Sequence, residues 1–139
     1  DDPLYPCNAL EKEFGPVYSF SCGRNQPTVL IDKFKYNFEE VIKVCLAASS
    51  EQFKTACFDA IGFNVSKSTT DPKQIITLCN QIKADEYASR CANAAAGELI
   101  FQEVPGWREA APAVCNMLPA SFAADCHNYI QRLRQEYAR

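Results

Sequence analysis

Residues 45–57, CLAASSEQFKTAC, carry the pattern that decides the fold. The first cysteine lies at the end of one apolar stripe, two serines follow, and the second cysteine lies on the next apolar stripe. The pattern returns at residues 79–91, CNQIKADEYASRC, and at residues 115–126, CNMLPASFAADC. A period of about 35 residues is typical of arrays of helical hairpins. We therefore expect most of the chain to consist of copies of one unit.

An aromatic residue lies four positions before the second cysteine of each couple. The couples are Cys7 and Cys22, Cys45 and Cys57, Cys79 and Cys91, and Cys115 and Cys126. The aromatic residues are Tyr18, Phe53, Tyr87 and Phe122. Residues four apart share one face of a helix, so each aromatic is expected to pack beside its cysteine in the core. The alternative is that the four rings line a tunnel for an apolar ligand.

Helix signals frame the repeated units. Asn37 precedes an apolar stripe, with Glu40 at the position of a capping box, and Asp71 followed by Pro72 is typical of a helix start. Gly62 is placed to end a returning helix. These signals predict an all-α fold of three stacked helical hairpins that follow an N-terminal capping unit.

The eight cysteines predict four disulfides. Their number is even, and the chain has no Cys-x-x-Cys pair, which is typical of a protein from an oxidising compartment. Sequence alone leaves on the order of a hundred connectivities open. Pairing within each couple is the simplest of them, and it would staple each hairpin near its turn. We therefore predict Cys7–Cys22, Cys45–Cys57, Cys79–Cys91 and Cys115–Cys126.

The first unit departs from the repeat. Gly15-Pro16 interrupts the turn, and the residues from Gly23 to Pro27 disfavour a continuing helix. The segment 28–36 is rich in β-branched and aromatic residues and is predicted to be an extended arm. The expected organisation of residues 1–139 is a single domain with a capping unit and arm at 1–36, and hairpins at 37–66, 67–104 and 105–139.

Composition excludes several partners. The formal net charge is −3 and no lysine-arginine block occurs, so we expect no nucleic-acid partner. The uncharged run 110–124 is short and contains Pro112 and Pro119, so we expect no membrane span. The chain begins Asp1-Asp2-Pro3, as a protein does after removal of a signal peptide, which predicts a secreted protein, extracellular or periplasmic.

No residue pattern predicts catalysis, a metal site or a cofactor. His127 is the single histidine, and as a neighbour of Asp125 in sequence it points in a different direction on a helix. The acidic pairs Glu39-Glu40 and Asp85-Glu86 lie at predicted helix starts, where they favour the helix dipole. The sequence therefore predicts a protein that is not an enzyme.

The first functional hypothesis is a structural module that binds a protein partner or associates with itself. The candidate contacts are Trp107, in a connecting segment, and Leu30, Phe34 and Tyr36 on the predicted arm. Asn64, in the sequence Asn64-Val65-Ser66, is a candidate glycosylation site. The alternative hypothesis is an extracellular carrier of a small apolar molecule that binds between the hairpins.

Overall fold

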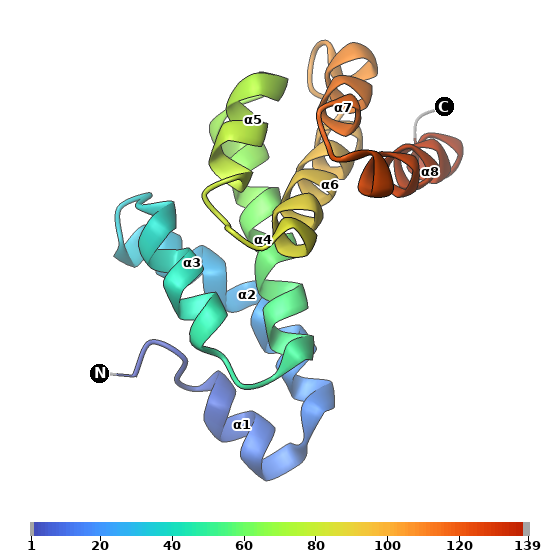
Figure 1. The fold of residues 1–139 in the computed structure, drawn as a ribbon. Helices are drawn as coiled ribbons and strands as arrows, with labels where there is room; N and C mark the ends of the chain where they lie inside the picture. Colours follow the sequence, from blue (N-terminus) through green and yellow to red (C-terminus); the bar gives the residue numbers. More distant parts are fainter. Residues whose placement is uncertain (1, 138–139) are drawn as a thin grey trace. The chain divides into compact units, whose positions relative to one another are not determined.

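The computed structural model describes residues 2–137, and within this range it contains eight α-helices and no strand (Figure 1). The predicted all-α fold is confirmed. The helices are α1 (Cys7–Phe14), α2 (Pro16–Lys33), α3 (Phe38–Ala47), α4 (Glu51–Ser68), α5 (Pro72–Cys79), α6 (Asp85–Phe101), α7 (Trp107–Asn116) and α8 (Ala120–Tyr137). No helix in the described range is long and apolar enough to cross a membrane.

Each of four disulfides joins two consecutive helices. The bonds are Cys7–Cys22 between α1 and α2, Cys45–Cys57 between α3 and α4, Cys79–Cys91 between α5 and α6, and Cys115–Cys126 between α7 and α8. The Cα atoms of the bonded cysteines lie 5.5 to 5.9 Å apart. The bonds therefore divide the helices into four consecutive, covalently joined pairs.

The predicted extended arm at residues 28–36 is wrong. Helix α2 continues through Pro27 to Lys33, and three residues complete the turn before Asn37. The helix is maintained by a buried stripe at helical spacing, formed by Ser19, Gly23, Pro27, Leu30 and Ile31. Packing of this stripe overrides the local preference of β-branched residues for extended backbone. The first of the four repeated segments is consequently a helix pair like the other three.

Two helix starts have a side-chain cap, and a third, at Asn37, lacks the predicted one. The Asp71 carboxylate accepts a hydrogen bond from the Lys73 backbone N–H at 3.0 Å, and the Ser50 hydroxyl accepts one from the Phe53 N–H at 3.2 Å. Asn37 lies at the start of α3 as expected, but its side chain makes no capping hydrogen bond. Helix α3 instead begins with buried Phe38, so its start is set by packing.

The chain forms two compact units, one ending at Ile61 and the other beginning at Gly62. The boundary falls inside the continuous helix α4. The first unit has its own buried core, which includes Leu30, Ile31, Val41, Phe53 and Phe58. The core of the second unit includes Ile75, Leu99, Ile100, Val114 and Ile130. Each unit is thus stabilised by its own apolar core and by two disulfides.

Gly62 does not end a helix, contrary to the prediction, because α4 continues to Ser68. Its role is close packing: a Cβ atom at Gly62 would meet the backbone of Cys91 in α6. Gly23 of α2 lies in the same way against Phe53 and Ala56 of α4, and Gly97 of α6 lies against the Tyr129 side chain of α8. The second helix of each pair therefore approaches the second helix of the next pair through a glycine.

Candidate functional site

One face of α2 is exposed to solvent, although the sequence predicts no helical surface of this kind at residues 28–36. Tyr18 is 47% exposed, Val29 is 61% exposed, and Ser21 and Asn25 between them are also exposed. These four residues lie on one side of the helix, because their positions differ by three, four and four residues. We call them the α2 stripe. Its ends are apolar and its middle is small and polar.

More apolar surface lies beside the N-terminal end of the α2 stripe. Phe14, at the end of α1, is exposed, and its ring centroid lies 5.3 Å from that of Tyr18. Val17 is 77% exposed. Gly15 (φ 87°) reverses the chain between α1 and α2, and Pro16 then starts α2, which brings Phe14 next to Tyr18.

The repeat explains why this face is unusual. Phe53 occupies in α4 the position that Tyr18 occupies in α2, and it is only 3% exposed. Gly23 of α2 lies against the Phe53 backbone, so the preceding second helix covers that position in α4. No preceding helix of the described chain covers Tyr18 in the same way. The α2 stripe is the face that another helix covers at the next step of the repeat.

The structure corrects the predicted interface residues. Leu30 belongs to the buried stripe of α2, and Phe34 is half-buried. Trp107, a candidate contact, is 6% exposed, because it begins α7 and packs against two arginine side chains. Tyr36 is exposed, at the turn that follows α2. Sequence reasoning missed Val29: its helical spacing from Tyr18 would have placed the two residues on one face of a helix, but the exposure of that face depends on tertiary packing.

Asn64 is also placed differently from the prediction. It lies inside helix α4 and is buried, with Val65 fully buried next to it. A buried side chain within a helix does not favour attachment of a glycan, since such acceptors usually lie in surface loops. The candidate glycosylation site is therefore not supported by the fold.

Glu39, Glu40 and His127, which the sequence offers as candidates for chemistry, have structural partners. Lys43 forms ion pairs with Glu39 at 3.1 Å and Glu40 at 2.8 Å, and the hydrogen bonds to Glu40 and then Glu39 raise the pKa of Lys43. His127 lies 2.8 Å from the Asn116 side-chain oxygen, which ties α8 to the end of α7. No group of three potential metal ligands occurs among the described residues.

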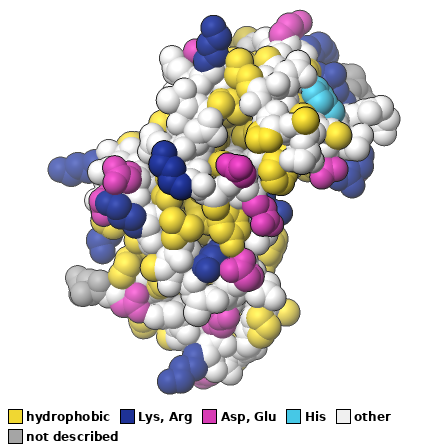
Figure 2. All heavy atoms as spheres, in the orientation of Figure 1, with side chains coloured by type: hydrophobic (Ala, Val, Ile, Leu, Met, Phe, Trp, Pro, Cys, Tyr) yellow, Lys and Arg dark blue, Asp and Glu magenta, His cyan; other side chains and the backbone are white. Residues whose placement is uncertain are grey.

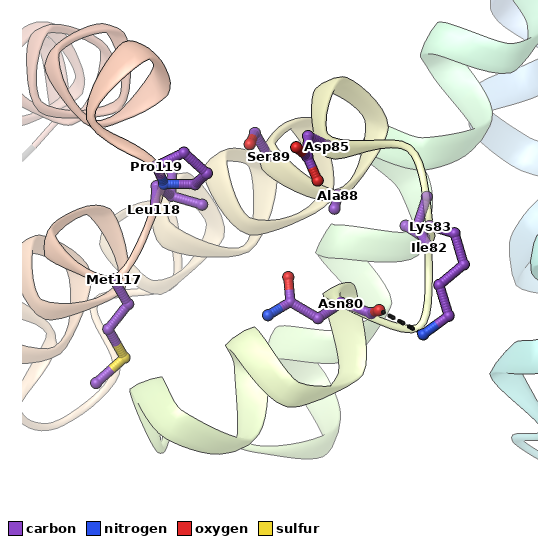
Figure 3. A pocket seen from close by; sticks show the side chains of 9 residues that line it. All are labelled: Asn80, Ile82, Lys83, Asp85, Ala88, Ser89, Met117, Leu118 and Pro119. Carbon is purple, nitrogen blue, oxygen red and sulfur yellow. Dashed lines mark hydrogen bonds between the residues drawn. The ribbon is translucent and has the colours of Figure 1, made fainter.

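An open cleft of about 440 Å³ lies in the second unit between two helix connections. Figure 3 shows Asp85, Ala88 and Ser89 of α6 along one side and Leu118 and Pro119 of the α7–α8 connection along the other. The Lys83 ammonium group lies 3.5 Å from the Asn80 carbonyl oxygen at its edge. This mixed, partly charged lining does not favour a small apolar ligand.

Charge is distributed evenly over the face that Figure 2 shows, where acidic and basic side chains alternate. Such a surface has no basic block of the kind that binds a phosphate backbone. Comparison of the chain with protein-family models, curated proteins and solved structures finds no match. Function is therefore inferred from the exposed residues themselves.

Proposed function

We propose that this protein is a secreted, non-enzymatic assembly module that binds a second copy of itself through the α2 stripe. The observation that supports this proposal is the exposure of Tyr18 and Val29 on one side of a disulfide-linked helix. The four disulfides are typical of proteins from oxidising, extracellular compartments. A rigid helix with an uncovered apolar face is suited to helix–helix association.

The α2 stripe is self-complementary. When two copies of α2 run antiparallel and cross at the level between Gly23 and Arg24, Tyr18 of each copy faces Val29 of the other. The middle of the crossing then contains Ser21, Asn25 and half-buried Cys22, whose side chains are small enough to let the helices approach. The interface would be closed and two-fold, which gives a dimer and not a filament.

The other end of the repeat is less suited to bind the α2 stripe. Helix α8 exposes Gln131, Arg132 and Gln135 along its outer side and has no glycine for close approach. A head-to-tail chain of copies would therefore bury polar and charged groups against Tyr18 without partners. Pairing of two α2 stripes avoids this cost, so we favour it over head-to-tail assembly.

The expected dimer is weak. Burial of an exposed valine or aromatic side chain contributes about 1.5 to 3 kcal/mol, and association itself costs at least about 4 kcal/mol. Four such side chains, two from each copy, give a net free energy of at most about 8 kcal/mol, so the expected affinity is micromolar at its strongest. Sedimentation velocity across a wide range of protein concentrations is expected to show a monomer–dimer equilibrium.

A double variant tests the proposal directly. Tyr18→Ser together with Val29→Ser removes both apolar ends of the stripe and is expected to weaken dimerisation by at least about tenfold. Leu46→Ser, at an exposed apolar position on α3, is the matched control and is expected to dimerise like the original protein. A wild-type protein that stays monomeric at every concentration, or a double variant that dimerises equally well, would refute the proposal.

A further inference from the structure

Two arginine side chains converge on the single tryptophan of the chain. The Cζ atom of Arg108 lies 4.5 Å from the centroid of the Trp107 ring, and that of Arg134, from α8, lies 5.2 Å from the same centroid. Both distances are within the range of cation–π contacts. Both guanidinium groups therefore lie against the same tryptophan ring.

A hydrogen bond and a disulfide between α7 and α8 stabilise the placement of the arginine side chains beside Trp107. The Nη2 atom of Arg134 donates a hydrogen bond of 2.9 Å to the backbone carbonyl oxygen of Arg108. The Cys115–Cys126 disulfide joins the two helices that carry these residues. Trp107 itself is buried, and the hydrogen bond to Arg108 holds the Arg134 guanidinium group in place before any ligand binds.

Neither guanidinium group is neutralised by a carboxylate of residues 2–137. The Nε atom of Arg134 is shielded from solvent and has no hydrogen-bond partner within that range. A buried donor without a partner is costly, and two uncompensated like charges repel each other. Arg108 also lies in the first turn of α7, where the helix dipole adds positive potential.

We infer that Trp107, Arg108 and Arg134 form a binding site for a tetrahedral oxyanion, namely sulfate or phosphate. A guanidinium group presents N–H donors in a planar fork that matches two oxygen atoms of such an anion. One dianion in contact with both groups would neutralise both charges and supply acceptors to their accessible N–H donors. The ligand would be either the free inorganic ion or the same group as an ester on a larger molecule. The site is independent of the α2 stripe and of self-association.

Trp107 provides the signal for the test, because it is the single tryptophan and both arginines contact its ring. We would record its fluorescence while adding sodium sulfate, sodium phosphate or a sulfated oligosaccharide at constant ionic strength, with sodium chloride as the reference. A saturable change is expected with at least one oxyanion and not with chloride. Saturation by inorganic ions assigns a free-ion site, and saturation by the oligosaccharide alone assigns a sulfate ester.

Four variants locate the site. Arg108→Gln and Arg134→Gln are each expected to weaken binding by about tenfold or more, since each removes one charged fork. Arg132→Gln, which removes an exposed arginine two residues from Arg134 on the same helix, is expected to bind within about twofold of the original protein. Arg134→Lys keeps the charge without the fork and is expected to bind with intermediate affinity.

Circular dichroism of each variant separates loss of binding from loss of folding. If Arg134→Gln does not fold, the exposed Arg108→Gln and the Arg134→Lys variants decide the question. Absence of a saturable signal in the original protein with every oxyanion would overturn the inference. An equal loss of affinity in Arg132→Gln would also overturn it, because it would reveal a general charge effect. Sedimentation of Arg108→Gln is expected to match that of the original protein, so this test and the dimer test fail separately.

Discussion

Gly62 of α4 lies directly against the backbone of Cys91 in α6, so that a Cβ atom on Gly62 would clash with the Cys91 carbonyl oxygen. The same Cβ would also be 2.9 Å from the Cβ of Ala94. Such distances are too short for real atoms, and neither the α6 backbone nor an alanine can rotate away. The approach of these two helices therefore requires glycine at position 62.

The first prediction is that Gly62→Ala destabilises the protein by about 3 kcal/mol, because α4 and α6 have to move apart. Gly97→Ala is the matched comparison, since its Cβ would meet the Tyr129 side chain at 2.6 Å, and that side chain can move. Its expected cost is below about 1 kcal/mol, partly offset by the higher helix propensity of alanine. Urea unfolding midpoints of the two oxidised variants measure the difference. Equal stability of Gly62→Ala and the original protein would show that the helices are not in this contact.

The second prediction concerns the order in which the disulfides are reduced. Cys22 is half-buried, whereas the other seven cysteines have at most 1% of their surface exposed. Thiol–disulfide exchange requires access of the attacking thiolate to a sulfur atom. We expect a limiting amount of reductant to open Cys7–Cys22 first, which alkylation and peptide mapping would detect.

The remaining three bonds serve as internal controls in that experiment. First labelling of Cys45, Cys79 or Cys115 would contradict the predicted order. Cys22 also lies at the middle of the proposed α2 crossing, so reduction of its bond is expected to slow at protein concentrations that favour the dimer. The double variant Tyr18→Ser and Val29→Ser should lose this concentration dependence while it keeps the same order of reduction.

Cysteine spacing predicted most of the helices because each disulfide requires the bonded Cα atoms to be close, and consecutive helices meet that requirement near their connection. The start of α3 at Phe38 and of α5 at Pro72 agree with the sequence signals. The sequence predicts an arm at residues 28–36, where α2 ends, because the β-branched and aromatic residues of this segment favour extended backbone. The buried residues Ser19, Gly23 and Leu30 carry the helical period that overrides it.

Neither the oxyanion site at Trp107 nor the α2 stripe could be predicted from local sequence patterns. Trp107 and Arg134 are far apart in sequence, and their contact arises from the packing of α7 on α8. The sequence makes Trp107 a candidate contact because of its place in a connecting segment, but α7 begins at this residue and buries it. The exposure of Tyr18 is likewise a tertiary property, since the equivalent residue Phe53 is buried by α2.

Helices α2 and α6 end in the same backbone arrangement. After α2, the Tyr36 N–H donates to the Ile31 carbonyl oxygen at 2.9 Å, and the Lys35 N–H donates to that of Asp32 at 3.1 Å. Lys35 has a positive φ of 52°. This is a Schellman motif, in which the left-handed position usually contains glycine.

The end of α6 repeats this motif with Glu103 at the left-handed position, where φ is 47°. The Val104 N–H donates to the Leu99 carbonyl oxygen at 3.3 Å, and the Glu103 N–H donates to that of Ile100 at 3.0 Å. A non-glycine residue in this conformation costs about 1 to 2 kcal/mol. Both positions therefore carry backbone strain that glycine would relieve.

The third prediction is that Lys35→Gly and Glu103→Gly each raise the free energy of unfolding by about 0.5 to 1 kcal/mol. The gain is smaller than the strain because glycine also increases the entropy of the unfolded chain. Lys33→Gly, at the last residue of α2, is the control and is expected to lower stability by up to about 1 kcal/mol, since that residue is helical. Urea unfolding measures all three, and a loss of stability in both Lys35→Gly and Glu103→Gly would show that neither helix ends in the left-handed conformation.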